Sequence, residues 1–170
     1  MNNTKNNEDK FLKLISNLEL KTSLFIVSCT KEKIWEYEKD AQNFICAKKA
    51  YRGEDFIYFL NLITKYDLEN KNFNWIIFSG KYGFIEPEHP IAYYDVYLGN
   101  PNQYPISLET LQNQARQMRW WRDNRNNFKK IKLINFKKIV CVNCDLIYIK
   151  SIKKCFKNHE LLFIKDIREY

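Results

Sequence analysis

The sequence predicts an α/β fold: a single domain with a central, mostly parallel four-stranded sheet flanked by helices. The main observation is that apolar runs of strand length alternate with stretches whose apolar residues recur at helical spacing, which is typical of parallel sheets with crossover helices. In addition, 170 residues fit one domain. Four glycines and four prolines are too few for the many turns of an all-β sandwich.

In the first half of the chain, residues 1–10 (MNNTKNNEDK) are polar and are expected to be a flexible arm, which leaves a domain at 11–170. The run SLFIVSC at 23–29 is continuously apolar before its polar end, as in a central strand covered on both faces. Apolar residues at helical spacing predict helices in the flanking segments, at 11–18, at about 40–50 and at 56–66.

In the second half, NWIIFSG at 74–80 predicts another buried strand. The segment 81–105 carries all four prolines and many aromatic residues, which indicates a long, ordered loop. Ser107 with Thr110 predicts the start of a helix that runs to about Phe128. The remaining expected elements are a strand at 138–143, a helix at 147–156 and a last strand at 160–164.

Ligands of open parallel sheets bind beyond the carboxyl ends of the strands, near a topological switch point. Three expected strands end at Cys29, at Ser79-Gly80 and at Asn143-Cys144. The residues just after those ends are therefore predicted to meet on one rim, and they are 30–33, 81–83 and 145–148.

The predicted rim contains residue types that suit an anionic, flat ligand. Lys31, Lys33 and Lys81 are candidates to bind a phosphate or carboxylate. Aromatic residues of the loop, including Tyr82 and Tyr94, are candidates to stack on a base or sugar. Further candidates lie at the strand ends and in the sequence motifs described below. The complete predicted substrate-binding set is Lys31, Lys33, Tyr51, Ser79, Lys81, Tyr82, Gly83, Tyr94 and Tyr148.

Two residues are candidates for catalysis. Asp95 is the acidic residue with an obvious loop position near the rim, so it is the candidate general acid or base; the alternative is that it only closes a turn. Cys29 is a candidate nucleophile because neighbouring lysines favour the thiolate; the alternative is a small packing residue at a strand end.

The positive charge is concentrated in one segment. Nine of the 28 basic residues and one of the 20 acidic residues lie between Arg116 and Lys138, which accounts for the whole net charge of +8. On the predicted helix these side chains form a broad basic face with tryptophans among them, a pattern found where phosphates and bases are bound; the alternative is a solvated face with no ligand. The candidate nucleic-acid-binding residues are Arg116, Arg119, Trp120, Arg122 and Arg125.

The cysteines do not indicate a metal site. Five cysteines in a chain with no export signal are expected to be reduced thiols. Cys141 and Cys144 form one CxxC pair, whereas structural zinc usually requires four ligands, so neither a metal nor a cofactor is expected. No apolar run reaches the roughly 18 residues of a membrane span, so a cytoplasmic location without a membrane partner is expected. The oligomeric state is not predicted.

Several motifs resemble those of one family. SCTKEK at 28–33, Ala50-Tyr51 followed by Phe56, WIIFSGKYGFIEP at 75–87 and AYYDVYL at 92–98 resemble a domain-of-unknown-function family, number six-eight-eight-four. VNCDLIYIKSI at 142–152 resembles its last element, in which a tyrosine opens a helix. The departures are Ala92 for the usual proline, Gly80 for alanine, Asn143-Cys144 for a turn of the Ala-Gly type, and the arginine-rich segment.

The resemblance implies little about activity, because that family has no established one. It implies an architecture distantly similar to uracil-DNA-glycosylase-like α/β domains, and some relatives are joined to transglycosylase-like proteins that handle deazaguanine bases. Neither of the loop signatures of those glycosylases is present in this sequence. Chemistry on a base is therefore an expectation by analogy.

The leading hypothesis is a protein that binds a nucleotide or nucleic acid, DNA or RNA, and acts as a glycosidase or transferase on the base or the N-glycosidic bond. The alternative is a non-catalytic binding module of a phage or mobile-element system that docks an acidic partner through the basic helix. A third hypothesis is an enzyme acting on a phosphorylated metabolite.

Overall fold

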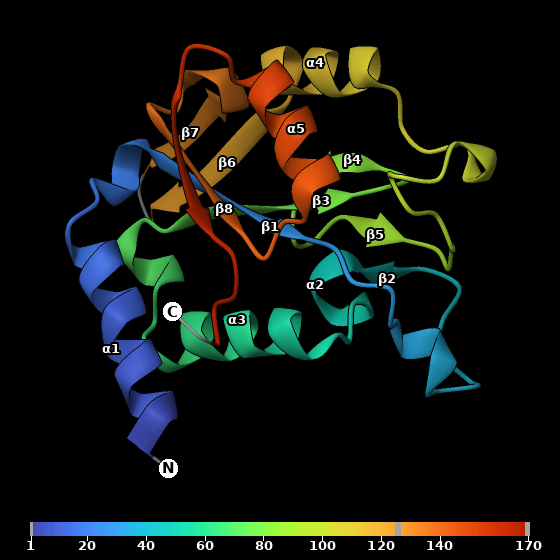
Figure 1. Ribbon diagram of the computed structural model, residues 1–170, viewed down its shortest axis with the longest axis horizontal. Helices are drawn as coiled ribbons and strands as arrows, with labels where there is room; N and C mark the ends of the chain where they lie inside the picture. The colour runs from blue at the N-terminus through green and yellow to red at the C-terminus, as the bar shows by residue number, and fades with distance from the viewer. Residues whose placement is uncertain (1, 125–126, 169–170) are drawn as a thin grey trace.

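The computed structural model describes residues 2–124 and 127–168, and its centre is a five-stranded sheet (Figure 1). The strands are β1 (Ser23–Ser28), β3 (Asn74–Ser79), β4 (Gly83–Ile85), β8 (Lys138–Val142) and β9 (Glu160–Ile164). Their order is β4-β3-β1-β8-β9, and every neighbouring pair is parallel except β3 and β4. The α/β class and the mostly parallel sheet are confirmed, while the predicted number of four strands is too small.

The additional strand, β4, comes from a chain reversal directly after β3. Gly83 has a φ of +75°, in the region that favours glycine, and there the chain turns back so that Phe84 pairs with Phe78. The sequence predicts this segment as part of the long loop because three residues carry no periodicity of their own.

Helices cover both faces of the sheet (Figure 1). In β1 successive side chains alternate: Phe25 and Val27 belong to one core, and Leu24 and Ile26 to the other. Helix α1 (Asn2–Ser16) and helix α3 (Glu54–Lys65) pack on the first core. Helix α4 (Leu108–Gln117) and helix α5 (Leu146–Cys155) pack on the second core. Both faces of the central strands are therefore buried, as the apolar runs predicted.

The other elements are short. Strands β2 (Ile45–Cys46) and β5 (Pro90–Ile91) form an antiparallel pair beside helix α2 (Ala47–Ala50). The predicted helix at 40–50 is thus reduced to its last turn, because residues 45 and 46 are extended to pair with β5. Five 3₁₀ turns occur in the described residues: η1 (Leu20–Thr22), η2 (Ile34–Glu36), η3 (Glu69–Lys71), η4 (Pro101–Gln103) and η5 (Leu133–Asn135).

The start of the chain differs from the prediction. Helix α1 begins at Asn2, so residues 2–10 are helical where a flexible arm was expected. Glu8 ties this helix to α3, since its carboxylate accepts a hydrogen bond of 2.7 Å from the Tyr66 hydroxyl and pairs with Lys65. A polar sequence can remain helical when such tertiary contacts fix it.

The arginine-rich segment also differs from the prediction. Helix α4 ends at Gln117, and the chain continues as an antiparallel hairpin of β6 (Arg119–Asn124) and β7 (Asn127–Lys132). Trp, Phe and Ile are compatible with strands, and the cross-strand pairing of this segment selects the hairpin over a helix. The broad basic helical face of Arg116, Arg119, Trp120, Arg122 and Arg125 therefore does not exist: Arg116 is in α4, three of these residues are in β6, and Arg125 lies outside the described residues.

The connections create a switch point between β1 and β8. The chain leaves β1 through α2 and α3 on one face to reach β3, and it leaves β8 through α5 on the other face to reach β9 (Figure 1). Adjacent strands whose connections diverge in this way leave a crevice at their carboxyl ends. None of the helices in the described residues is long and apolar enough to cross a bilayer.

Candidate ligand pocket at the carboxyl edge of the sheet

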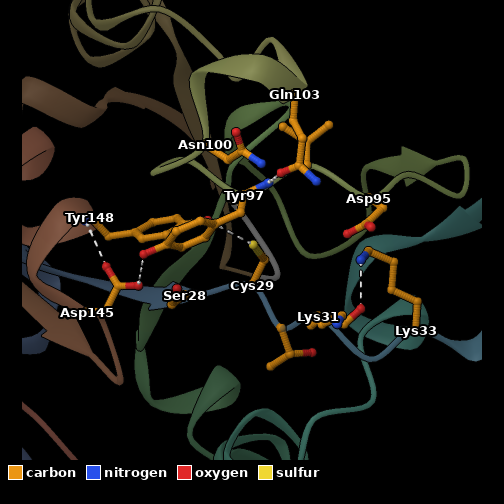
Figure 2. Close-up of a pocket in the computed structure, with 12 residues that line it drawn as sticks. Ser28, Cys29, Lys31, Lys33, Asp95, Tyr97, Asn100, Gln103, Asp145 and Tyr148 are labelled. Carbon is orange, nitrogen blue, oxygen red and sulfur yellow. Dashed lines mark hydrogen bonds between the residues drawn. The ribbon is translucent and has the colours of Figure 1, made fainter.

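A cavity of about 440 Å³ lies at this switch point (Figure 2). Its walls come from the end of β1, from the start of α5 and from the loop at 95–103. Its volume is within the usual range for small-molecule sites. We call it the switch-point pocket; its lining residues are Ser28, Cys29, Thr30, Lys31, Lys33, Asp95, Val96, Tyr97, Asn100, Gln103, Asp145 and Tyr148.

Lys33 is the most unusual of these residues, because it is a lysine with only 3% of its surface exposed. Its ammonium donates a hydrogen bond of 2.8 Å to the Lys31 carbonyl and lies 4.5 Å from the centre of the Tyr94 ring. In the described part of the chain it has no carboxylate partner in a salt bridge. Burial lowers the pKa of Lys33, while Cys29, Asp95 and other nearby groups act in the opposite direction.

The backbone around Lys33 explains its position. Lys33 forms an isolated antiparallel bridge with Tyr51, and the amide of Arg52 donates to the Glu32 carbonyl at 2.9 Å. These bonds fix the loop after β1 against the segment that precedes α3. The Lys33 side chain is therefore directed inward, whereas Lys31, two residues earlier, is exposed at the mouth of the pocket.

Cys29 lies directly after β1, and its amide donates to the Phe78 carbonyl at 3.0 Å. Its Sγ is 3.6 Å from the Tyr148 hydroxyl and is partly accessible from the pocket. Burial, and then the nearby Cys29, raise the pKa of Tyr148, so its hydroxyl remains a proton donor at neutral pH. The thiol thus faces a protonated hydroxyl on one side of the pocket.

Asp145 organises the wall on the α5 side. As the N-cap of α5, its Oδ1 accepts hydrogen bonds from the amides of Ile147 and Tyr148, at 3.0 and 3.2 Å. Its Oδ2 accepts a hydrogen bond of 3.1 Å from the Tyr97 hydroxyl (Figure 2). Asp145 therefore connects the helix start to the loop at 95–103.

The loop at 95–103 is itself held by side chain to backbone bonds. The Tyr97 amide donates to Gln103 Oε1 at 2.8 Å, and the Asn102 amide donates to Asn100 Oδ1 at 3.1 Å. Gly80 lets this loop approach the sheet, since a Cβ there would lie 2.7 Å from the Val96 carbonyl oxygen. The loop at 95–103 therefore forms an ordered wall of the pocket.

A chain of three buried hydroxyls lies behind the pocket. Tyr94 is 2.7 Å from Ser79 Oγ and 2.6 Å from the Tyr51 hydroxyl. Ser79 Oγ also accepts from the amides of Lys81 and Tyr82, at 3.2 and 3.1 Å, so its own hydrogen must go to Tyr94. Burial raises the pKa of both Tyr51 and Tyr94, so both are protonated. The three hydroxyls carry three hydrogens, but only two hydrogen bonds join them, so one hydroxyl hydrogen has no acceptor within this group.

The structure brings part of the predicted site together, whereas the predicted rim segment 81–83 does not line the pocket. Five predicted residues line the switch-point pocket: Cys29, Lys31, Lys33, Asp95 and Tyr148. Tyr51, Ser79 and Tyr94 are buried next to it rather than lining it. The Lys81 ammonium lies 5.4 Å from the Tyr82 ring and 5.7 Å from the Tyr94 ring, so Lys33 and Lys81 both lie near Tyr94.

Gly83 and Arg116 have local roles in the structure. Gly83 is buried in the β3–β4 turn, and a Cβ there would lie 2.2 Å from Gln114 Oε1. Arg116 donates from Nη2 to Asn113 Oδ1 at 2.6 Å on the exposed side of α4. Neither residue lines the switch-point pocket.

Tyr97, Asn100 and Gln103 are pocket residues that the sequence does not predict. The segment Gly99-Asn100-Pro101 is a turn signal, but no local pattern shows that the turn folds over a strand end. Asp145 was included only as part of the rim, although an Asp before an apolar helical run is an N-cap signal.

The cysteines of the CxxC motif are free thiols in the core. Cys141 is buried, and Cys144 Sγ is 3.5 Å from the Val142 carbonyl oxygen and 3.6 Å from that of Ile26. Among residues 2–124 and 127–168 no group of three or more His, Cys, Asp or Glu is placed to hold a metal ion.

Comparisons with protein-family models, curated proteins and solved structures found no match. The similarity to the family of unknown function therefore stays a prediction based on the motifs alone.

Proposed function

We propose that the switch-point pocket binds a nucleotide, free or within a nucleic acid, and that the protein acts on its base or N-glycosidic bond. The observation that carries the proposal is the buried ammonium of Lys33, placed beside the Tyr94 ring at a cavity of about 440 Å³. A buried cation without a salt-bridge partner in the described residues favours an anionic ligand that supplies the partner.

The remaining wall residues fit the other parts of a nucleotide. Lys31 at the mouth can contact a phosphate, and the exposed ring of Tyr97 offers a flat surface to a base or sugar. Asp95 faces the same space with an exposed carboxylate, in a position to contact a base edge or to exchange a proton with a leaving group.

Calorimetric titration with nucleoside 5′-monophosphates, the matching nucleosides and ribose 5-phosphate tests the proposal. We expect the monophosphates to bind, the nucleosides to bind at least about tenfold more weakly, and Lys33→Met to lose binding. Lys13→Gln, which removes an exposed charge on α1, is the matched control and should bind normally. No binding of any monophosphate at low salt would refute the proposal.

A second candidate function concerns the β6–β7 hairpin. Its register pairs Arg119 with Lys132 and Arg122 with Lys129, so residues of like charge occupy opposite positions. Such pairs disfavour a hairpin unless an anion compensates them. This observation favours docking of nucleic acid or an acidic protein there. Binding of single-stranded and duplex oligonucleotides across salt concentrations tests it, and the Lys33→Met variant should retain this binding.

A further inference from the structure

We propose that Lys33 is a nucleophilic amine that forms an imine with the C1 carbonyl of a sugar phosphate held in the switch-point pocket. The inference rests on the proposed function, because it takes the sugar of the bound nucleotide as the group that Lys33 reaches. It adds a covalent role, carried out by the unprotonated amine, to the anion-binding role of the Lys33 ammonium.

The first argument is the environment of the amine. An amine attacks a carbonyl only when it is unprotonated, and burial is the main means by which proteins obtain such a lysine near neutral pH. Lys33 is 3% exposed, and burial lowers its pKa, whereas Lys31 in the same pocket is exposed.

The second argument is the placement of the amine at the cavity wall. Its single hydrogen bond in the described residues goes to the Lys31 carbonyl, which orients Nζ and leaves the rest of the group directed at the Tyr94 ring and the pocket. Figure 2 shows the Asp95 carboxylate pointing toward this amine on the same side of the pocket, and Asp95 is one of the charges that act on Lys33. A carboxylate in that position can take up and return the protons that imine formation moves.

The chemical step is balanced without any further reagent. The Nζ lone pair forms a bond to the carbonyl carbon, and the carbonyl oxygen becomes a hydroxyl with a proton that passes through Asp95. The hydroxyl then leaves as water with a second proton, and the C=N bond remains. On an intact N-glycoside, the same attack at C1′ breaks the C1′–N bond. The base then leaves with the electron pair and takes up the proton that Nζ loses.

The test is trapping with 2-deoxyribose 5-phosphate and sodium cyanoborohydride, which reduces an imine to a stable secondary amine. Intact mass spectrometry counts the adducts, and peptide mapping locates them. We expect one adduct per chain, on Lys33, and none when the sugar phosphate has been reduced to its alcohol at C1. Adducts spread over the exposed lysines, with none preferred at Lys33, would overturn the inference.

Variants separate chemistry from folding. Lys33→Arg retains the charge but cannot form the imine, so it should lose the adduct; Lys13→Arg should retain it. Thermal unfolding of each variant checks the fold, and if Lys33→Arg does not fold, the mapped position of the adduct in the wild-type chain still decides. A nucleoside monophosphate that binds without protecting Lys33 from trapping would also contradict the inference.

The outcomes also distinguish the two proposals. Nucleotide binding without any trapped adduct would refute the imine and leave the proposed function intact. Trapping at Lys33 in a protein that binds no nucleotide would refute the proposed function and support a carbonyl-binding site of another kind.

Discussion

The carboxyl end of β1 and the β6–β7 hairpin lie at opposite ends of the sheet (Figure 1). The switch-point pocket is at that end of β1, and the two regions obtain their positive charge in different ways. The hairpin belongs to the segment that carries the whole net charge of the chain. The pocket lies in the part whose charges cancel, yet its lysines are concentrated by folding and one of them is buried. A high density of basic residues along the sequence therefore indicates a charged surface. A buried charge, which costs free energy to bury, indicates a functional site.

The two regions also differ in what holds them. The walls of the pocket are fixed by hydrogen bonds to the side chains of Asp145, Gln103 and Asn100. The loop at 95–103 also packs closely against Gly80. The hairpin is defined by its own pairing, from Arg119 opposite Lys132 to Asn124 opposite Asn127. Changes in one region are expected to leave the other unaffected, because distant sites without shared partners act independently.

The largest effect is expected from Gly80→Ala. The new Cβ would lie 2.7 Å from the Val96 carbonyl oxygen, 3.0 Å from the Leu98 amide and 3.1 Å from the Tyr148 hydroxyl. Two of these atoms are backbone, so the loop must move, and we expect a loss of about 1 to 3 kcal/mol in the free energy of unfolding. Chemical denaturation measures it. Nucleotide binding should fall as well, while oligonucleotide binding by the hairpin is unchanged; unaltered nucleotide affinity would contradict this account of the pocket.

Lys33→Met is expected to separate stability from function. The variant should be at least as stable as the wild type at neutral pH, by up to about 2 kcal/mol, since it removes a buried charge. It should nevertheless lose nucleotide binding by tenfold or more. A buried lysine that only supported the fold would give the opposite pattern, a less stable protein with normal binding.

The pH dependence of that stability difference has a definite sign. Burial lowers the pKa of Lys33 in the folded state below its ordinary value of 10.5. At a pH between the pKa of Lys33 in the folded chain and its pKa in the unfolded chain, the unfolded chain binds more protons than the folded chain. The wild type therefore gains stability as the pH rises. The advantage of Lys33→Met should therefore shrink as the pH approaches 10.5, as measured by denaturation of both proteins at each pH.

Effects on stability alone, without the loss of binding expected for Gly80→Ala, are expected in the buried hydroxyl chain. Tyr94→Phe removes two hydrogen bonds and leaves Ser79 without its acceptor, which should cost about 1 to 3 kcal/mol. Tyr51→Phe removes one bond and one hydroxyl from a group with a surplus hydrogen, so it should cost about 1 kcal/mol or less. Equal losses in the two variants would argue against the hydrogen-bond directions assigned to this chain.

Much of the fold could be predicted because the strands at 23–28, 74–79, 138–142 and 160–164 are buried and read as apolar runs. The rim could be predicted because the carboxyl ends of parallel strands meet at one edge of the sheet. Lys33 and Tyr148, predicted to meet there, line one pocket. The hairpin was missed because the spacing of its arginines fits a helix, and nothing in that spacing shows the cross-strand pairing that tertiary structure selects.

The parts of the site that could not be predicted depend on contacts between distant segments. Tyr97 reaches Asp145, and Gly80 meets Val96, so their roles appear only when the loop at 95–103 lies over the strand ends. The burial of Lys33 likewise depends on its bridge to Tyr51. Side-chain type identified the candidates, whereas only the folded arrangement distinguishes the buried lysine from the exposed one.

The smallest effect is expected from single charges of the hairpin. If Arg122 neutralises one phosphate of a bound oligonucleotide, Arg122→Gln should reduce the magnitude of the slope of log affinity against log salt by about 0.7 to 0.9. Lys13→Gln, on α1, should not change the slope. If Lys33→Met changed the slope as much as Arg122→Gln, one nucleic acid would have to contact both ends of the sheet, and the separation of the two regions would be wrong.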